Sequence, residues 1–280
     1  MEEEAHLQVN LTRSAREFAD RAGALLRARI EHNVLATVLE HARRFSDAEN
    51  LFATVATVAA GDGEIVAAAL RVGGRRMLAS EMDQRCAIAL VGAWLEADPG
   101  LPGVGAPATV ARSIADEFQR LTGRGHTLEL DMALHALETV EGPARPAAGA
   151  LRPAADGDRE LLIDWMGDFM VEAGLEDDPA QMVDRRPMYV WEDGEPASVV
   201  ARSDEVAEVV RIGPVYTPPQ YRGRGYASSA VAAISRAALA AGARQCILYT
   251  DLANPTSNRI YAALGYRRVG DWEERVFEPR

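Results

Sequence analysis

Residues 215–227 read Val215-Tyr-Thr-Pro-Pro-Gln-Tyr-Arg-Gly-Arg-Gly-Tyr-Ala227 and join a predicted strand to a predicted amphipathic helix. Gly223 and Gly225 allow the backbone to turn tightly, so several N–H groups can converge where the helix begins. Such a helix N-terminus binds phosphate through its unpaired donors and its dipole, and Arg222 and Arg224 add positive charge. An ordinary strand-to-helix turn with two solvated arginines would have the same local sequence.

The strand before this loop, residues 206–216, contains Gly213-Pro214. A regular central strand does not tolerate proline, so the sequence predicts a bulge or a splay at this point. A dinucleotide-binding fold is disfavoured, because its fingerprint needs three spaced glycines after the first strand and Ala227 stands in place of the third.

Residues 251–266 read Asp251-Leu-Ala-Asn-Pro-Thr-Ser-Asn-Arg-Ile-Tyr-Ala-Ala-Leu-Gly-Tyr266 and follow a predicted buried strand, residues 246–251. With both segments in this order and spacing, the sequence resembles the GNAT acetyltransferase superfamily over about residues 150–280. Residues 222–227 match the pyrophosphate loop of that family, and residues 254–265 match its Asn…Tyr…Leu-Gly segment.

The resemblance implies that acetyl-CoA is the co-substrate, without a metal, and lies between two splayed central strands. Backbone groups of the first strand would hold the pantetheine and thioester, at Val215, Tyr216 and Thr217. Loop amides would cradle the pyrophosphate, at Arg222, Gly223, Arg224, Gly225, Tyr226, Ala227 and Ser228. Asn254 matches a residue that contacts the pantetheine arm, Asn258 completes the cofactor set, and Tyr261 matches the tyrosine that protonates the departing thiolate.

Each of these side chains also has a structural interpretation. Asn254 is a good helix N-cap, and Tyr261 has helical spacing from Leu264, as a core aromatic would. For the general base, Glu208 is the carboxylate on the bulged strand near the motif. It is one residue out of register, which turns it to the other face unless the bulge restores it, and a solvated strand-edge Glu is the alternative.

Acidic residues follow the first helix of the second half, in a segment that lines the acceptor side in proteins that this chain resembles. Asp177 and Asp178 there would attract a protonated amine, whereas a solvated acidic turn before Pro179 is the other interpretation. The predicted activity is direct transfer of an acetyl group to a small-molecule or peptide amine in a ternary complex. A non-catalytic acyl-CoA sensor or scaffold, and a transferase for a longer acyl-CoA, are the alternatives.

The stretch Glu141–Gly149 interrupts all periodicity with two prolines and two glycines, which predicts a linker and two domains, 1–145 and 146–280. The fold class is α/β (α+β), with two GNAT-like domains, each a mixed, mostly antiparallel sheet flanked by helices. The first domain carries Glu81-Met-Asp-Gln-Arg85 where the glycine loop would be. Its acids would repel a pyrophosphate, so we expect a degenerate copy and one CoA per chain.

Composition excludes other classes. The chain has 280 residues, a net charge of −12, 48% hydrophobic residues and two cysteines, which disfavours nucleic-acid binding, a disulfide framework and a four-ligand zinc site. No apolar run approaches the roughly 20 residues that cross a membrane, and the acidic start has no signal-peptide core, so a cytoplasmic protein is predicted. An oligomer is compatible with the sequence. Residues 126–140 and 266–277 are each predicted to form a pair of strands, and residues 188–203 a hairpin.

Overall fold

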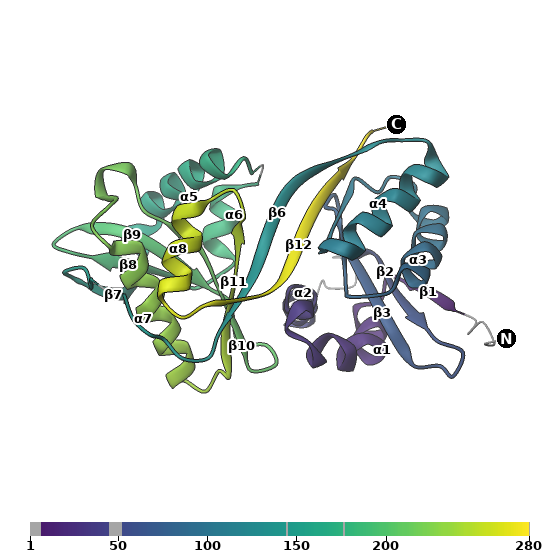
Figure 1. Ribbon diagram of the computed structural model, residues 1–280, viewed down its shortest axis with the longest axis horizontal. Helices are drawn as coiled ribbons and strands as arrows, with labels where there is room; N and C mark the ends of the chain where they lie inside the picture. Colours follow the sequence, from purple (N-terminus) through teal and green to yellow (C-terminus); the bar gives the residue numbers. More distant parts are fainter. Residues whose placement is uncertain (1–6, 45–51, 144, 176, 280) are drawn as a thin grey trace. The chain divides into compact units, whose positions relative to one another are not determined.

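The computed structural model describes residues 7–44, 52–143, 145–175 and 177–279 (Figure 1). Contacts divide the chain into two compact units, which we call unit 1 (Met1–Ala133 with Gly270–Arg280) and unit 2 (Leu134–Val269). Each unit is a mixed, mostly antiparallel sheet flanked by helices, which confirms the predicted fold class.

Unit 1 has the strand order β1-β2-β3-β4-β5-β12. Its strands are β1 (Gln8–Thr12), β2 (Phe52–Ala59), β3 (Ile65–Val72), β4 (Met77–Ala79), β5 (Gly103–Pro107) and β12 (Arg267–Phe277). Its helices are α1 (Ala15–Ala28), α2 (Asn33–Arg44), α3 (Gln84–Ala97) and α4 (Ala108–Thr122). Strands β1 to β4 are antiparallel, β4 and β5 are parallel with α3 between them in the chain, and β12 is antiparallel to β5.

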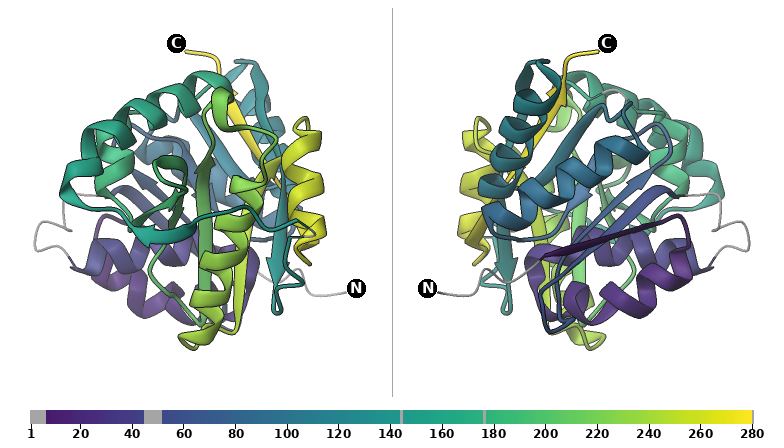
Figure 2. Two further views of the ribbon diagram at one scale, coloured as in Figure 1. Left: turned by 90° about the vertical axis from the view of Figure 1, so that its left-hand side faces the viewer. Right: turned by 90° about the vertical axis from the view of Figure 1, so that its right-hand side faces the viewer.

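Both faces of the unit 1 sheet are covered by helices. One face packs against α3 and α4 in a cluster that includes Trp94, Ile114 and Phe118, while α1 contacts β2 and β3 and buries Phe18. Figure 2 (right) shows α3 and α4 in blue and α1 and α2 in purple on different sides of the strands. Helix α1 begins after Ser14, whose hydroxyl caps it by accepting a hydrogen bond from the Glu17 amide.

Unit 2 has the strand order β7-β8-β9-β10-β11-β6, in which β6 contributes its last residues. Its strands are β7 (Ala150–Pro153), β8 (Met188–Glu192), β9 (Pro196–Arg202), β10 (Val209–Tyr216), β11 (Gln245–Asp251) and the end of β6 (His126–Leu137). Its helices are α5 (Arg159–Ala173), α6 (Pro179–Asp184), α7 (Tyr226–Ala240) and α8 (Pro255–Ala263). Strands β7 to β10 are antiparallel, with the predicted β8–β9 hairpin, and β10 and β11 are parallel with α7 between them in the chain. The two units therefore share one topology.

Two helical layers enclose the unit 2 sheet. Helix α7 packs on one face, where Val210 and Ile212 of β10 join its buried side chains. Helices α5 and α6 pack on the other face, where Tyr216 of β10 joins Trp165 and Val183. A regular pleat would direct Val210, Ile212 and Tyr216 to one face, because they are separated by even numbers of residues. The register shift between Ile212 and Val215 therefore moves Tyr216 to the opposite layer.

The predicted strand pairs at residues 126–140 and 266–277 are wrong. Each segment contains one long strand, β6 with 12 residues and β12 with 11. The chain passes from unit 1 to unit 2 within β6 and returns within β12 (Figure 1). Each segment is long because it serves both units, so neither contains a turn.

The two contact units do not divide the chain at the predicted boundary near Pro146. Residues 134–145 belong to unit 2, and residues 270–280 belong to unit 1. The predicted linker is bound along unit 2: the Glu141 amide donates to the Leu264 carbonyl, and the Ala147 amide donates to the Ser229 hydroxyl at 2.9 Å. The described residues on both sides of residue 144 are therefore bound to unit 2 in this proline- and glycine-rich stretch.

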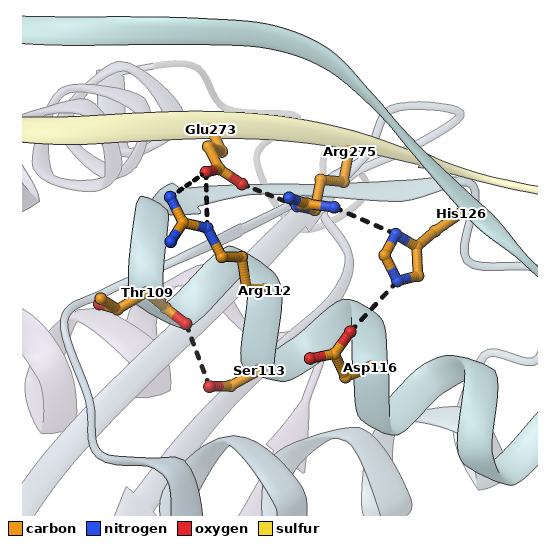
Figure 3. Close-up of polar contacts among 7 residues, drawn as sticks. All are labelled: Thr109, Arg112, Ser113, Asp116, His126, Glu273 and Arg275. Carbon is orange, nitrogen blue, oxygen red and sulfur yellow. Dashed lines mark hydrogen bonds and ion pairs between the residues drawn. The ribbon is translucent and has the colours of Figure 1, made fainter.

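A buried carboxylate fixes the C-terminal strand to unit 1 (Figure 3). Glu273 of β12 accepts hydrogen bonds from Arg112 of α4, at 2.8 and 2.6 Å, and from Arg275 at 2.7 Å. The Arg275 guanidinium also donates to His126 Nδ1, and His126 Nε2 lies 3.4 Å from the Asp116 carboxylate. This network joins β12, α4 and the start of β6, so the closing strand of unit 1 depends on residues far away in the sequence.

We predict that Glu273→Gln lowers the free energy of unfolding by about 3 kcal/mol, because it leaves two guanidinium groups without their buried carboxylate. Chemical denaturation measures the effect. Glu96→Gln on the exposed side of α3 is the matched control and should change stability by less than about 0.5 kcal/mol. Equal stability of the two variants would show that β12 is held by apolar packing alone.

Candidate active site

The two central strands of unit 2 separate after a short shared ladder. Strands β10 and β11 pair in parallel only from Val209 to Arg211 within the described residues. Beyond that point β10 pairs with β9, and its register shifts between Ile212 and Val215. The bulge predicted at Gly213-Pro214 is therefore confirmed, and it opens a gap in the sheet between β10 and β11.

Side-chain hydrogen bonds hold the end of β10 on the β9 side. The Ser198 hydroxyl donates to the Tyr216 carbonyl at 2.9 Å and lies 2.8 Å from the Thr217 hydroxyl. On the other edge, the backbone of Val215 and Tyr216 has no strand partner on β11 in the part of the chain that the structure describes. Unpaired backbone donors and acceptors at such an edge are available to an extended polar ligand.

The loop after β10 ends at an uncapped helix N-terminus. Gly223 and Gly225 have φ of +77° and +84°, in the left-handed region that favours glycine. Gly225 is the N-cap of α7, and no described side chain accepts a hydrogen bond from its first amides. The first amides of a helix lack partners within the helix, so those of α7 are available to an anion.

The two glycines have different surroundings. A Cβ atom on Gly225 would lie 3.2 Å from the Arg145 carbonyl oxygen, so this glycine allows the segment before β7 to approach the helix. A Cβ atom on Gly223 would meet nothing within 4 Å among the described residues. Of the two, Gly223 is therefore the position whose side chain would extend into the open space of the loop.

The Arg222 side chain points back to α5. Its guanidinium donates to both carboxylate oxygens of Glu172, at 2.7 and 2.8 Å, and its Nε donates to the Thr217 carbonyl. It also lies 5.7 Å from the ring centroid of Tyr216. The ion pair with Glu172 offsets the charge of Arg222, so this side chain holds the loop against α5. The Arg224 side chain is exposed.

The side chains of Tyr216 and Tyr226, two aromatic residues of the predicted site, make structural contacts within unit 2. Tyr216 is buried under α5 with its ring edge-on to Phe169, and Tyr226 donates a hydrogen bond to Asp193 at 2.6 Å. These contacts engage both side chains, so a contribution to the predicted site would come from the backbone groups of the two residues. Ala227 and Ser228 follow in the first turn of α7, where the Ser228 hydroxyl bonds the Gly225 carbonyl.

The equivalent helix of unit 1 begins differently. Helix α3 also lies between two parallel strands, but its N-cap is Asp83, whose carboxylate accepts a 2.7 Å hydrogen bond from the Cys86 amide. This bond lowers the pKa of the Asp83 carboxyl, so the group is ionised at neutral pH. The place that an external anion would take is therefore occupied by a carboxylate of the chain itself.

Asn254 and Asn258 lie at the start of α8, directly after β11. The Asn254 side chain caps the helix by accepting from the Ser257 amide at 3.0 Å. The Asn258 amide donates to the carbonyl oxygens of Asp251 and Asn254. Asn254 is exposed and Asn258 is half-buried at the end of the strand that borders the gap, and both already have local hydrogen bonds.

Tyr261 lies on the inner side of α8. Its ring packs edge-on against Tyr266 with centroids 6.0 Å apart, and it joins the apolar cluster under α7. Its hydroxyl interacts with Ser257, one turn earlier, and burial raises the pKa of Tyr261 to about 12. The phenol is thus protonated at neutral pH.

The structure places Glu208 away from the gap. Ala207 and Glu208 have φ of +54° and +62° in a tight turn before β10, and the Glu208 carbonyl accepts from the Arg244 amide. Its carboxylate is exposed and lies 3.7 Å from the Arg244 guanidinium. At about 3.3 Å per strand residue, Val215 is roughly 20 Å further along β10. Glu208 therefore does not reach the end of β10 that borders the gap, because it belongs to the turn before the strand.

The two acids predicted to attract the acceptor have structural partners. Asp178 is the N-cap of α6 and accepts from the Ala180 amide at 2.9 Å, and Asp177 lies 3.2 Å from the Arg185 guanidinium. These contacts favour the interpretation as a capped acidic turn.

Sequence reasoning missed two arginines beside the bulge, Arg186 and Arg211. Arg186 precedes β8 and donates a 2.7 Å hydrogen bond to the Gly213 carbonyl. Arg211 lies in β10 between two buried aliphatic residues. A charged residue in the middle of the apolar stretch Val209–Val215 was the available signal.

The described residues contain no group of three or more His, Cys, Asp and Glu side chains that could hold a metal ion. None of the helices described is long and apolar enough to span a bilayer.

Comparisons with known proteins agree with this geometry. Residues 157–266 match the model of the Acetyltransferase (GNAT) family. A GCN5-related N-acetyltransferase from Kribbella flavida is 17% identical, with 89% of this chain and 96% of that chain covered and a TM-score of 0.62. A Drosophila protein is 13% identical, with 98% and 99% covered and a TM-score of 0.67.

A tandem GNAT protein from the clavulanic acid biosynthesis pathway is 14% identical, with 98% of both chains covered and a TM-score of 0.56. No curated protein sequence matches the chain. At these identities the solved structures establish the fold alone, and their coverage extends it over both units.

We predict that Gly223→Val weakens CoA binding by at least tenfold, because a branched side chain at positive φ distorts the loop and fills its open space. Isothermal titration calorimetry measures the affinity. Gly242→Val is the matched control: Gly242 has φ of +117° and equally open surroundings among the described residues, but follows the other end of α7. If both variants bound CoA equally, the loop would not be the binding site.

Proposed function

We propose that the chain is a GNAT acyltransferase through unit 2, whose residues 157–266 match the model of that family, and that unit 2 transfers an acetyl group from acetyl-CoA to an amine. The observation that carries the proposal is the combination of the gap between β10 and β11 with the uncapped start of α7. The gap offers backbone groups to an extended pantetheine arm. The helix start offers amides to a pyrophosphate.

The residues present fit acetyl-CoA on chemical grounds. Two glycines at positive φ expose the loop backbone, and the first amides of α7 supply donors and a favourable dipole. The β11-facing edge of Val215, Tyr216 and Thr217 supplies further backbone groups. Bound acetyl-CoA would supply the acyl group as a thioester, and the protein would position it and bind the oxygen on which charge develops.

Direct transfer is favoured over an acyl-enzyme. Burial raises the pKa of the Cys246 thiol to about 12 and that of the Cys86 thiol to about 11, so both are protonated and unreactive at neutral pH. In the proposed reaction the amine attacks the thioester carbon, the carbon–sulfur bond breaks, and CoA leaves as a thiolate. With Glu208 remote, the proton of the amine passes to water.

Tyr261 is the proposed proton donor to the leaving thiolate. It lies about two turns beyond Asn254 on α8, the helix that follows the second strand of the gap. With a pKa of about 12 it holds its proton across the pH range in which an amine is reactive. A role in binding alone would not use the hydroxyl, which distinguishes an enzyme from an acyl-CoA sensor.

The remaining parts of the proposal concern partners. The acceptor is a small-molecule or peptide amine, which is a cation in water, and the location is cytoplasmic. Acetyl-CoA is preferred over a longer acyl-CoA as the donor. Unit 1 is proposed to bind no CoA, since Asp83 occupies its helix N-terminus.

We predict that Tyr261→Phe lowers the turnover number by roughly 10²- to 10⁴-fold while CoA affinity stays within about twofold, because the ring and its packing remain. Thiol release with the best acceptor from a panel of amines gives the rate. Tyr266→Phe is the control from the same aromatic pair: it loses a hydrogen bond to Ser235 and about 1 kcal/mol of stability, with turnover unchanged. Similar losses of turnover in the two variants would assign both tyrosines to packing.

We predict one CoA per chain in calorimetric titration. Asp83→Gly should remove the competing carboxylate from α3 without restoring a glycine loop, so the stoichiometry stays at one. A value near two for the unmodified protein would contradict the assignment of unit 1.

A further inference from the structure

Two arginines lie together at the closed end of the gap. Arg211 is the last residue of β10 that pairs with β11, opposite Ile247. Gly213, two residues later, accepts the hydrogen bond from Arg186 at 2.7 Å. The two guanidinium groups are close enough that Arg211 is the first cause of a pKa of Arg186 lowered to about 9.

Arg211 points away from α7. Its neighbours Val210 and Ile212 pack in the α7 layer, so the pleat of the strand directs Arg211 to the layer of α5 and α6. Arg186 follows α6 on that side. The pair therefore lies on one face of the sheet, at the point where β10 and β11 part.

This pair lacks the carboxylate partner that other arginines of unit 2 have. Arg152 binds both Asp158 and Glu192, and Arg222 binds Glu172. Neither Arg186 nor Arg211 forms an ion pair with any described residue, and the Arg211 Nε is buried without a hydrogen-bond partner in that part of the chain. Burial lowers the pKa of Arg211, with only the hydroxyl of Tyr249 acting in the opposite direction.

Such an arrangement is costly for the protein alone. Two like charges that lie close together in partly buried positions repel each other and lose part of their hydration, and the buried, unpaired Arg211 Nε adds a further penalty. A carboxylate from a ligand would remove all three costs, because it accepts parallel hydrogen bonds from guanidinium groups.

The position of the two arginines along β10 indicates which part of the bound reactants carries the anion. The amides proposed for the pyrophosphate follow the far end of β10, whereas Arg211 begins the opening and lies roughly 13 Å before Val215 along the strand. The thioester proposed at residues 215–217 thus lies between the arginines and the phosphate loop. An anion at the arginines belongs to the reacting end of the complex.

We propose that Arg186 and Arg211 form a subsite for a carboxylate carried by one of the two reactants of acyl transfer. The inference rests on the proposed acyl transfer. If the acceptor carries the carboxylate, it is an amino acid or similar amino-carboxylate and the donor stays acetyl-CoA; if the acyl chain carries it, the donor is a dicarboxylic acyl-CoA in place of acetyl-CoA. The amine and the carboxylate interact with different parts of the site.

The first experiment measures binding, which needs no turnover. CoA-loaded protein is titrated with a panel of N-acetylated amino acids, each paired with its neutral carboxamide. We expect at least one acid to bind about 10- to 100-fold more tightly than its amide, which is the range for hydrogen bonds between charged groups. Absence of such a preference across this panel and the donor comparison below would overturn the proposal.

Two variants test the arginines, Arg211→Met and Arg186→Gln. Each should abolish the preference for a carboxylate. Arg211→Met should not lower the thermal midpoint, because no ion pair within the described protein is broken, and Arg186→Gln should lower it only by the loss of its hydrogen bond to the Gly213 carbonyl. Arg244→Gln is the matched control, since it removes one positive charge at the exposed turn before β11 and should keep the preference. A preference that survives in both variants contradicts the proposal, and Arg186→Gln alone decides if Arg211→Met does not fold.

Kinetics then identify which reactant carries the carboxylate. Free amino acids and their amides are compared as acceptors with acetyl-CoA, and acetyl-CoA and succinyl-CoA are compared as donors to benzylamine. Discrimination in the first comparison assigns the carboxylate to the acceptor, and in the second to the acyl chain. If no thiol is released from any donor while binding still prefers the acids, the proposed transfer fails and the subsite stands.

Discussion

The loss of β11 as a partner of β10, while β9 stays paired on the other edge, is the constraint on which the proposed site depends. Strand β10 pairs with β11 as far as Arg211 and continues with β9 after the bulge that ends at Val215. Ser198 holds the end of β10 on the β9 side, and β11 leads separately into α8. A continuous ladder would satisfy these backbone groups within the sheet and leave no opening for a ligand. The gap thus exists because the end of β10 does not pair with β11. Its backbone groups on that edge are available to a ligand.

The two units have the same topology, but their corresponding helices, α7 and α3, begin differently. Each has a helix between two parallel strands, and the chemistry of the helix start differs by a few residues. Unit 2 begins α7 with Gly225 and exposed amides, whereas unit 1 begins α3 with Asp83, whose carboxylate already accepts an amide hydrogen. A helix N-terminus attracts one anion, and a built-in carboxylate satisfies it. The architecture is shared, and binding chemistry is retained where the terminus is left uncapped.

Local chemistry explains what could be read from the sequence. The Gly-Arg-Gly loop, the bulge at Gly213-Pro214 and the β8–β9 hairpin depend on residues close together in the chain, and the structure has all three. The unit boundaries depend on the pairing of β12 with β5, about 170 residues away, and nothing local in residues 266–277 indicates that partner. Glu208 shows the same limit on a smaller scale. Its place in a tight turn follows from the pairing of Val206 with Val209, which moves its carboxylate out of the strand.

The roles of charged side chains were the least predictable part of the site. Arg222 and Asp177 look available in the sequence, but each has an oppositely charged partner that only the fold brings near. Arg186 and Arg211 are separated by 24 intervening residues and come together only because α6, β8 and β10 pack around the bulge. Whether a charge is free for a ligand depends on tertiary neighbours, so composition and motif cannot decide it.

Amide hydrogen exchange of the full chain, with and without CoA, tests the central claim most directly. If the gap and the uncapped helix form the cofactor site, CoA will slow exchange in residues 215–217 and 223–228 and leave residues 81–88 of unit 1 unchanged. Protection of residues 81–88, or unaltered exchange across 215–228 at a CoA concentration that saturates binding, would contradict the account.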